Sequence, residues 1–177
     1  MGLKKNTRAM ALAIVTAFAA MGSAQAENLY VGVGYTQYTF EGSGSVGSVK
    51  PTAATFKLGY VISPNFAVEG RVAAPASSDS VTVSSVNVEG KVDSHYGIFA
   101  KGILPLNEMF SVYGLVGFND LTLKASTPST SASSTKNGSS YGLGLDLSVS
   151  KNIALNLEFA RHFSDVTSAN LGVVYKF

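Results

Sequence analysis

Residues 140–163 read SYGLGLDLSVSKNIALNLEFARHF, and they decide the fold because two kinds of side chain alternate on both sides of Lys151-Asn152. An apolar residue recurs at every second position, and the positions between hold mainly glycine, asparagine or an acidic residue. Side chains of a β-strand point alternately to its two faces, so this period predicts two strands joined by a tight turn. With Lys151-Asn152 as the turn, we expect Asp146 and Glu158 to lie nearly opposite each other on neighbouring strands.

The alternation continues through the chain from Leu29, and turn-rich or polar stretches divide it into eight segments. These segments cover residues 29–40, 52–62, 66–74, 94–104, 110–123, 140–150, 153–163 and 169–177. Connections 63–65, 105–109 and 151–152 are short, connections 41–51, 75–93 and 124–139 are long and polar, and the fourth long-side connection, 164–168, is a short exception. Short turns at one end and longer loops at the other predict an all-β fold, an eight-stranded antiparallel up-and-down transmembrane β-barrel.

The two faces of these strands differ in a way that favours a membrane barrel over a water-soluble one. One face is apolar, as in Leu143, Leu155 and Val173, whereas the other collects glycines and charged residues. A soluble barrel would turn its apolar face inward. Glycine-rich polar faces suit a narrow lumen, however, and the apolar face carries aromatics near its ends, so we predict that apolar side chains point outward. A soluble periplasmic binding barrel is the alternative.

Aromatic residues of the apolar face fall into two groups along the predicted strands. The set at the loop end is Phe56, Tyr96, Phe118, Tyr141 and Phe163, and the set at the turn end is Tyr60, Phe66, Phe110, Tyr175 and Phe177. Amphipathic rings concentrate at the two interfaces of a membrane, so the sequence predicts two aromatic belts.

Residues 1–26 have the composition of a cleaved signal peptide. Lys4, Lys5 and Arg8 precede an apolar stretch that is too short to span a bilayer, and Ala24-Gln25-Ala26 supplies small residues for cleavage. We therefore expect export and a mature barrel domain of residues 27–177. That domain keeps ten basic and eleven acidic side chains, which gives no electrostatic footprint for nucleic acid. The absence of cysteine excludes disulfide scaffolds and thiol nucleophiles.

Three segments resemble the small outer-membrane β-barrel family that includes the OmpA transmembrane domain, OmpX and the opacity-type surface proteins. They are YVGVGY at 30–35, KLGY at 57–60 followed by a tight turn and Glu69, and NLGVVYKF at 170–177. The last segment is similar to the terminal signal read by the barrel-assembly machinery, carried here by Asn170, Gly172, Tyr175 and Phe177. The resemblance implies an outer-membrane location, contact with lipid and lipopolysaccharide, and function at the cell surface. We expect no peptidoglycan-binding domain after the barrel segments, so the resemblance does not imply the anchoring role of the larger relatives.

The polar face predicts a network of charged side chains inside the lumen. Its members are Lys57, Arg71 and Lys101 against Glu69, Asp146 and Glu158, with Lys176 near the periplasmic mouth. Buried charges are costly unless they are paired, so we interpret the set as salt bridges that plug the barrel. An acid/base dyad of Asp146 and Glu158 is the less favoured alternative, because an eight-stranded lumen is filled by side chains and admits no substrate.

The two histidines, His95 and His162, are too few and too far apart in the sequence to predict a metal site, and we expect no cofactor. Both face inward near the loop end by parity. The sequence His162-Phe163-Ser164 is similar to the His-x-Ser of lipid A deacylases, which are also eight-stranded barrels. Asp165 follows where that family has Asn, and the last strand holds no acidic residue, so the resemblance ends quickly.

Two long connections differ in character. Residues 126–134, STPSTSASS, are of low complexity and predict a mobile extracellular loop. Val81, Val83, Val86 and Val88 alternate within connection 75–93, which predicts a hairpin that continues the strands above the membrane and offers an edge to a partner. We expect a non-enzymatic protein that acts structurally or through its loops, in adhesion, contact with an extracellular protein or host ligand, or envelope integrity. A narrow porin-like channel is the main rival, and a deacylase is the second.

Overall fold

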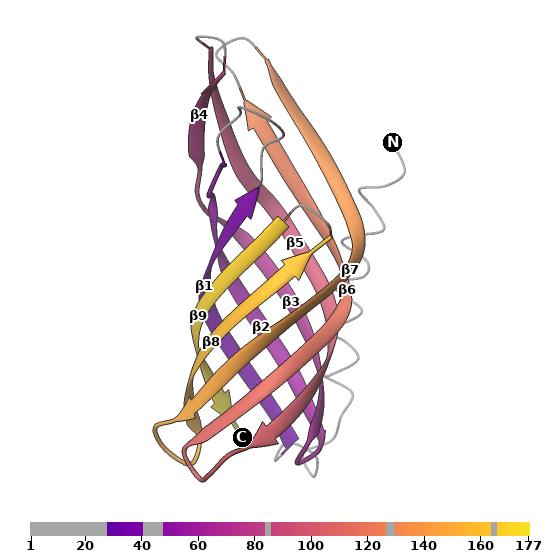
Figure 1. Cartoon of the computed structure of the whole chain (residues 1–177), viewed down its shortest axis with the longest axis vertical. Coiled ribbons are helices and arrows are strands. Elements are labelled where there is room, and N and C mark those ends of the chain that lie inside the picture. Colours follow the sequence, from indigo (N-terminus) through magenta and orange to yellow (C-terminus); the bar gives the residue numbers. More distant parts are fainter. Residues whose placement is uncertain (1–27, 41–47, 84–85, 127–129, 164–165) are drawn as a thin grey trace.

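The computed structural model describes residues 28–40, 48–83, 86–126, 130–163 and 166–177. These residues form one antiparallel sheet that closes on itself (Figure 1). Its strands are β1 (Leu29–Phe40), β2 (Thr52–Ser63), β3 (Phe66–Ser77), β4 (Asp79–Val83), β5 (Val86–Pro105), β6 (Phe110–Ser126), β7 (Ser131–Ser148), β8 (Ile153–His162) and β9 (Val166–Lys176). The predicted signal peptide and residue 27 lie outside the described residues. None of the described residues forms a helix long and apolar enough to cross a membrane.

The strand order β3-β2-β1-β9-β8-β7-β6-β5 closes into a ring through the pairing of β3 with β5. The short strand β4 pairs with the upper part of β5, while β3 pairs with its lower part, so β3 and β4 together fill one position of the ring. The predicted eight-stranded antiparallel barrel is therefore confirmed. In this ring β3 and β8 are four steps apart in both directions, which places them on opposite walls.

The faces point as predicted, with apolar side chains outward. Leu143 is 71% exposed, and Leu155 and Val173 are each 42% exposed. The six charged residues predicted for the lumen are each at most 5% exposed. This inversion of an ordinary soluble core presents a hydrocarbon-compatible surface all round the barrel.

At the loop end the strands are longer than the sequence suggested. β4 and the upper parts of β5, β6 and β7 rise above the other strands (Figure 1), and the pairing of β6 extends to Glu89↔Ser126 and Ser126↔Ser131. The predicted valine hairpin is confirmed, since Val81 pairs with Val88 and Val83 with Val86. The prediction of a loop over 126–134 was wrong for residues 126 and 131–134, which are strand; residues 127–129 lie outside the description. The serine- and threonine-rich composition of this segment does not indicate a strand, because the segment is held mainly by backbone pairing across the sheet.

Two details of the predicted arrangement were also wrong. Asp146 pairs with Asn156 rather than Glu158, because the turn is centred on Lys151 and the register shifts accordingly. Phe163 follows the end of β8 with a φ of 59°, and its ring packs against the buried apolar cluster at the loop end instead of joining the outer belt. Phe118 and Tyr141, in contrast, are 70% and 60% exposed on the outer face.

Candidate functional site in the barrel lumen

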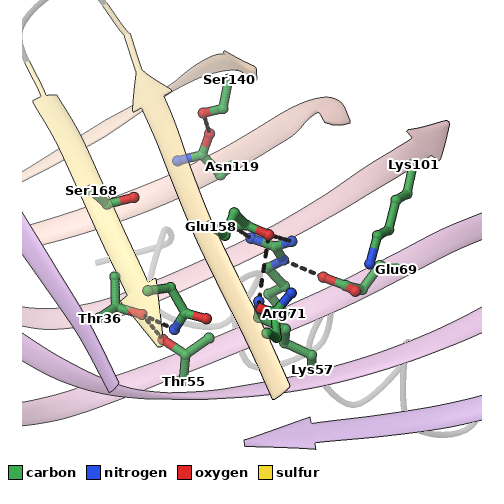
Figure 2. Close-up of polar contacts among 12 residues, drawn as sticks. Thr36, Thr55, Lys57, Glu69, Arg71, Lys101, Asn119, Ser140, Glu158 and Ser168 are labelled. Carbon is green, nitrogen blue, oxygen red and sulfur yellow. Dashed lines mark hydrogen bonds and ion pairs between the residues drawn. The ribbon is translucent and has the colours of Figure 1, made fainter. Parts of the chain in front are cut away.

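Arg71 of β3 holds the centre of the lumen together. Its Nη2 donates to Glu158 Oε2 at 2.8 Å, its Nη1 donates to Glu158 Oε1, and its Nε donates to Glu69 (Figure 2). The guanidinium also lies over the Phe99 ring, 4.5 Å from the ring centroid. Because Glu158 lies on β8, this bidentate ion pair spans the barrel from one wall to the opposite one.

Glu158 is the most connected carboxylate of the lumen. Besides Arg71, its Oε2 accepts from the Tyr113 hydroxyl at 2.8 Å and faces Lys57 Nζ at 3.5 Å. Lys57 Nζ donates to Asn156 Oδ1 at 2.7 Å. A carboxylate removed from water therefore has several donors, which is the condition for keeping such a charge buried.

The third cation, Lys101 of β5, pairs with Asp146 of β7 nearer the turn end. Its Nζ donates to Asp146 Oδ2 at 3.1 Å and lies 3.5 Å from the centroid of the Tyr113 ring. Asn156 Nδ2 donates to Asp146 Oδ1 at 2.6 Å. The structure thus brings all six predicted residues into two linked ion-pair groups with three positive and three negative charges.

Glycines opposite the large lumen side chains make this packing fit. Tyr30 pairs across the sheet with Gly59, and Tyr113 pairs with Gly144. A Cβ added to either glycine would collide with the ring of its tyrosine. Neither tyrosine was predicted to lie in the lumen, because their pairing with inward-facing glycines is visible only once the register is known.

Above the ions lies a polar layer built around two histidines. The ring centroids of His95 and His162 are 5.2 Å apart, although the two residues are distant in the sequence. Tyr38 Oη is 2.6 Å from His95 Nδ1, while Ser140 Oγ and Ser168 Oγ lie 3.0 and 2.8 Å from the two nitrogens of His162. His95 Nε2 is buried without a hydrogen-bond partner among the described residues. His162 faces inward, and Ser164 of the deacylase-like sequence lies outside the described residues.

An apolar cluster closes the lumen at the loop end. Its buried members are Tyr38, Ala53, Ala73, Val92, Leu121 and Val166, and Phe40, Leu123 and Phe163 pack against it. Val92, Leu121 and Val166 have no measurable exposure. From loops to turns, the described lumen therefore contains an apolar cap, a histidine layer and the ion network.

The predicted assembly residues occupy two environments on β9. Asn170 is buried and its Nδ2 donates to Thr36 Oγ1 at 2.7 Å, while Gly172 lies against the Val33 backbone. Tyr175 and Phe177 are exposed on the outer face, with ring centroids 5.1 Å apart in an edge-to-face arrangement. The two outward aromatics form an exposed pair at the turn end.

Solved membrane barrels resemble this structure over most of its length. Ail, the attachment invasion locus protein of Yersinia pestis, is 25% identical with a TM-score of 0.62, and the match covers 85% of this chain and 99% of that chain. Ail in complex with the heparin analogue sucrose octasulfate matches at 24% identity, a TM-score of 0.61, and coverage of 84% and 97%. Neisserial surface protein A matches at 16% identity, a TM-score of 0.62, and coverage of 85% and 97%.

Among curated protein sequences, none matches the chain. The family model described as outer membrane protein beta-barrel domain, however, matches residues 10–177. The match spans most of the sequence and agrees with the closed barrel and its apolar exterior. The chain therefore belongs to the outer-membrane protein β-barrel domain family.

Proposed function

We propose that this outer-membrane barrel is neither a channel nor an enzyme, and that it binds an extended segment of an extracellular protein at the edge of its loop-end sheet. The closed lumen is the observation that carries this proposal. An apolar cap and a neutralised ion network fill the space through which a solute would have to pass. Because this filling blocks passage from one side of the membrane to the other, the proposal places the main activity of the protein at its surface.

Strand β7 supplies the binding edge. β8 pairs with β7 only from Ser140 toward the turn end, and Phe163 N donates to Ser139 O. Residues 131–135 of β7 pair with β6 on one side, and no described strand pairs with their other side. Unpaired N–H and C=O groups along a strand are a template for an added strand.

The charges around this end favour a protein partner over a polyanion. Ail was solved with a sulfated sugar, sucrose octasulfate. In this chain the charged residues at the described loop end are nearly balanced, with Lys50, Lys91, Lys124, Lys136 and Arg161 against Asp79, Glu89, Asp93 and Asp120. A balanced surface gives little long-range attraction for a highly charged ligand, whereas strand addition depends on backbone hydrogen bonds.

Lipid and lipopolysaccharide are the expected surroundings of the exposed apolar belt, and the barrel-assembly machinery is the expected partner during insertion. We include in the proposal a cleaved leader of residues 1–26 and a mature domain of residues 27–177. Mass spectrometry of protein purified from outer membranes tests this point, since the measured mass should equal that of a chain that begins at Glu27.

Planar-bilayer recordings test the closed lumen. Purified protein should give no conductance steps, and steady single-channel currents would contradict the proposal in favour of a pore. Lipid A from cells that overproduce the chain should keep its mass, whereas loss of an acyl chain would indicate deacylase activity.

Proline substitutions test the edge itself. Neighbouring residues of β7 direct their N–H groups alternately toward β6 and toward the free edge, so Ser133→Pro and Ser134→Pro remove donors on different sides. Binding of the nanodisc-inserted protein to an array of immobilised extracellular-matrix and serum proteins is the readout. The proline that removes a donor to β6 breaks a native hydrogen bond and should lower the melting temperature more. The other proline removes a donor at the free edge, so it should lower the melting temperature less and the binding more. Equal binding by both variants and the unaltered protein would contradict strand addition.

A further inference from the structure

A cavity of about 310 Å³ opens at the turn end of the barrel, below the ion network. The short turns of bacterial outer-membrane barrels face the periplasm, so the cavity is open on that side. Its volume lies within the range of pockets that hold small molecules. The apolar cap and the Arg71–Glu158 pair close the lumen above it, so the cavity is a pocket with one mouth and not part of a passage.

The inner end of this pocket carries one buried ion pair. Lys101 and Asp146 both line it, and each is 5% exposed. An ammonium group has three N–H donors, and Asp146 is the one hydrogen-bond acceptor that the described residues give Lys101. Asp146 uses one oxygen for Lys101 and the other for Asn156, which leaves further lone pairs on its carboxylate. The pair can therefore both donate to a ligand and accept from it.

The walls between this pair and the mouth are largely apolar. The apolar residues that contribute to them are Val61, Ile103, Pro105, Met109 and Val174. Lys176 and Glu108 also line the pocket, so it holds two positive and two negative side chains in all. A ligand with a net charge would gain one partner and meet a like charge close by, and at the inner end both Lys101 and Asp146 are largely removed from water.

We propose that this pocket binds a small uncharged molecule with an amide or hydroxyl head and an apolar body. The head would accept a hydrogen bond from Lys101 Nζ and donate one to Asp146, while the body lies against Ile103 and Val174. This inference does not depend on strand addition at β7, because it concerns the opposite end of the barrel. Its failure would leave the proposed surface function untouched.

Benzamide, benzoate and benzamidine form a matched set of probes, since they share size and shape but are neutral, anionic and cationic. Each is titrated into nanodisc-inserted protein with labelled Ile, Val and Met methyl groups, and NMR shifts are recorded. Benzamide should shift the methyl resonances of Ile103, Val174 and Met109 in a saturable manner, with Kd on the order of 1 mM. The charged probes should bind about tenfold more weakly, because each places a charge beside a like charge.

Methyl groups of the outer face report on probe molecules that partition into the lipid. Their shifts therefore distinguish partition from binding in the pocket. Ser148 lines the pocket, so Ser148→Trp should abolish the saturable shifts, and the matched variant Ser80→Trp, at an exposed serine of the loop end, should retain them. Both variants must keep the heat-modifiable migration of the folded barrel. Three results overturn the proposal: shifts equal at Val173 and Val174, equal affinity for all three probes, or binding that survives Ser148→Trp.

Discussion

Replacing Glu158 with Gln tests whether the ion network holds the barrel together. Glutamine keeps the size of the side chain and one acceptor oxygen, but it leaves Arg71 and Lys57 with one negative charge fewer. Removing one partner of a buried ion pair costs about 3 to 5 kcal/mol, because the other charge stays out of water without compensation. Glu158 serves two cations and the Tyr113 hydroxyl, so we expect a loss of free energy of unfolding at the upper end of that range.

The measurement is urea unfolding in lipid vesicles, followed by tyrosine fluorescence because the chain has no tryptophan. Glu89→Gln is the matched control, since Glu89 is exposed on the loop-end part of β5, and it should change stability by less than about 0.5 kcal/mol. Adding Lys57→Met to Glu158→Gln restores the balance of charge, so the double variant should be more stable than the sum of the single losses predicts. A loss below about 1 kcal/mol for Glu158→Gln, or strict additivity with Lys57→Met, would refute the network as a source of stability.

Three further outcomes are expected. Gly144→Ala should destabilise the barrel by about 1 to 3 kcal/mol because its Cβ meets the Tyr113 ring, whereas Gly102→Ala, which has open space, should cost far less; vesicle unfolding compares them. Leu143→Arg should cost about 2 to 4 kcal/mol if the residue lies near the bilayer midplane, and an unchanged unfolding midpoint would argue against lipid contact there. Phe177→Ser should lower the amount of folded barrel in the outer membrane of cells, while refolding of the purified variant into detergent stays normal, which heat-modifiable migration measures in both settings.

The sequence predicted the barrel well because the lipid-facing side imposes a strict rule on every second residue. The same rule places three apolar side chains outside, Leu143, Leu155 and Val173, and two charged ones inside, Lys57 and Arg71. Its use requires no knowledge of the register between strands. Above the membrane the rule lapses, since both faces meet water. Strand residues such as Ser131–Ser139 therefore show no alternation, and their composition predicts a loop where the structure has a strand.

Partners within the lumen depend on register, and register was the weaker part of the prediction. The turn is centred on Lys151 and not between Lys151 and Asn152, so Asn156 lies opposite Asp146, and Glu158 lies two residues further along β8. The proximity of His95 and His162 follows from closure of the ring, because β5 and β8 are distant both in sequence and along the sheet. Closure also explains the roles of Tyr30 and Tyr113, whose rings fill space that exists only inside a finished barrel.

The position of Arg71 and Glu158 on opposite walls has a consequence for how the protein matures. While the sheet is still open, these two side chains are far apart and water can solvate both. The hydration of six ionised groups must then be given up at the step in which the first and last strands, β1 and β9, meet. Pairing of β1 with β9 is therefore the step of insertion most sensitive to salt. In this step the charged side chains of the lumen exchange contacts with water for contacts with one another.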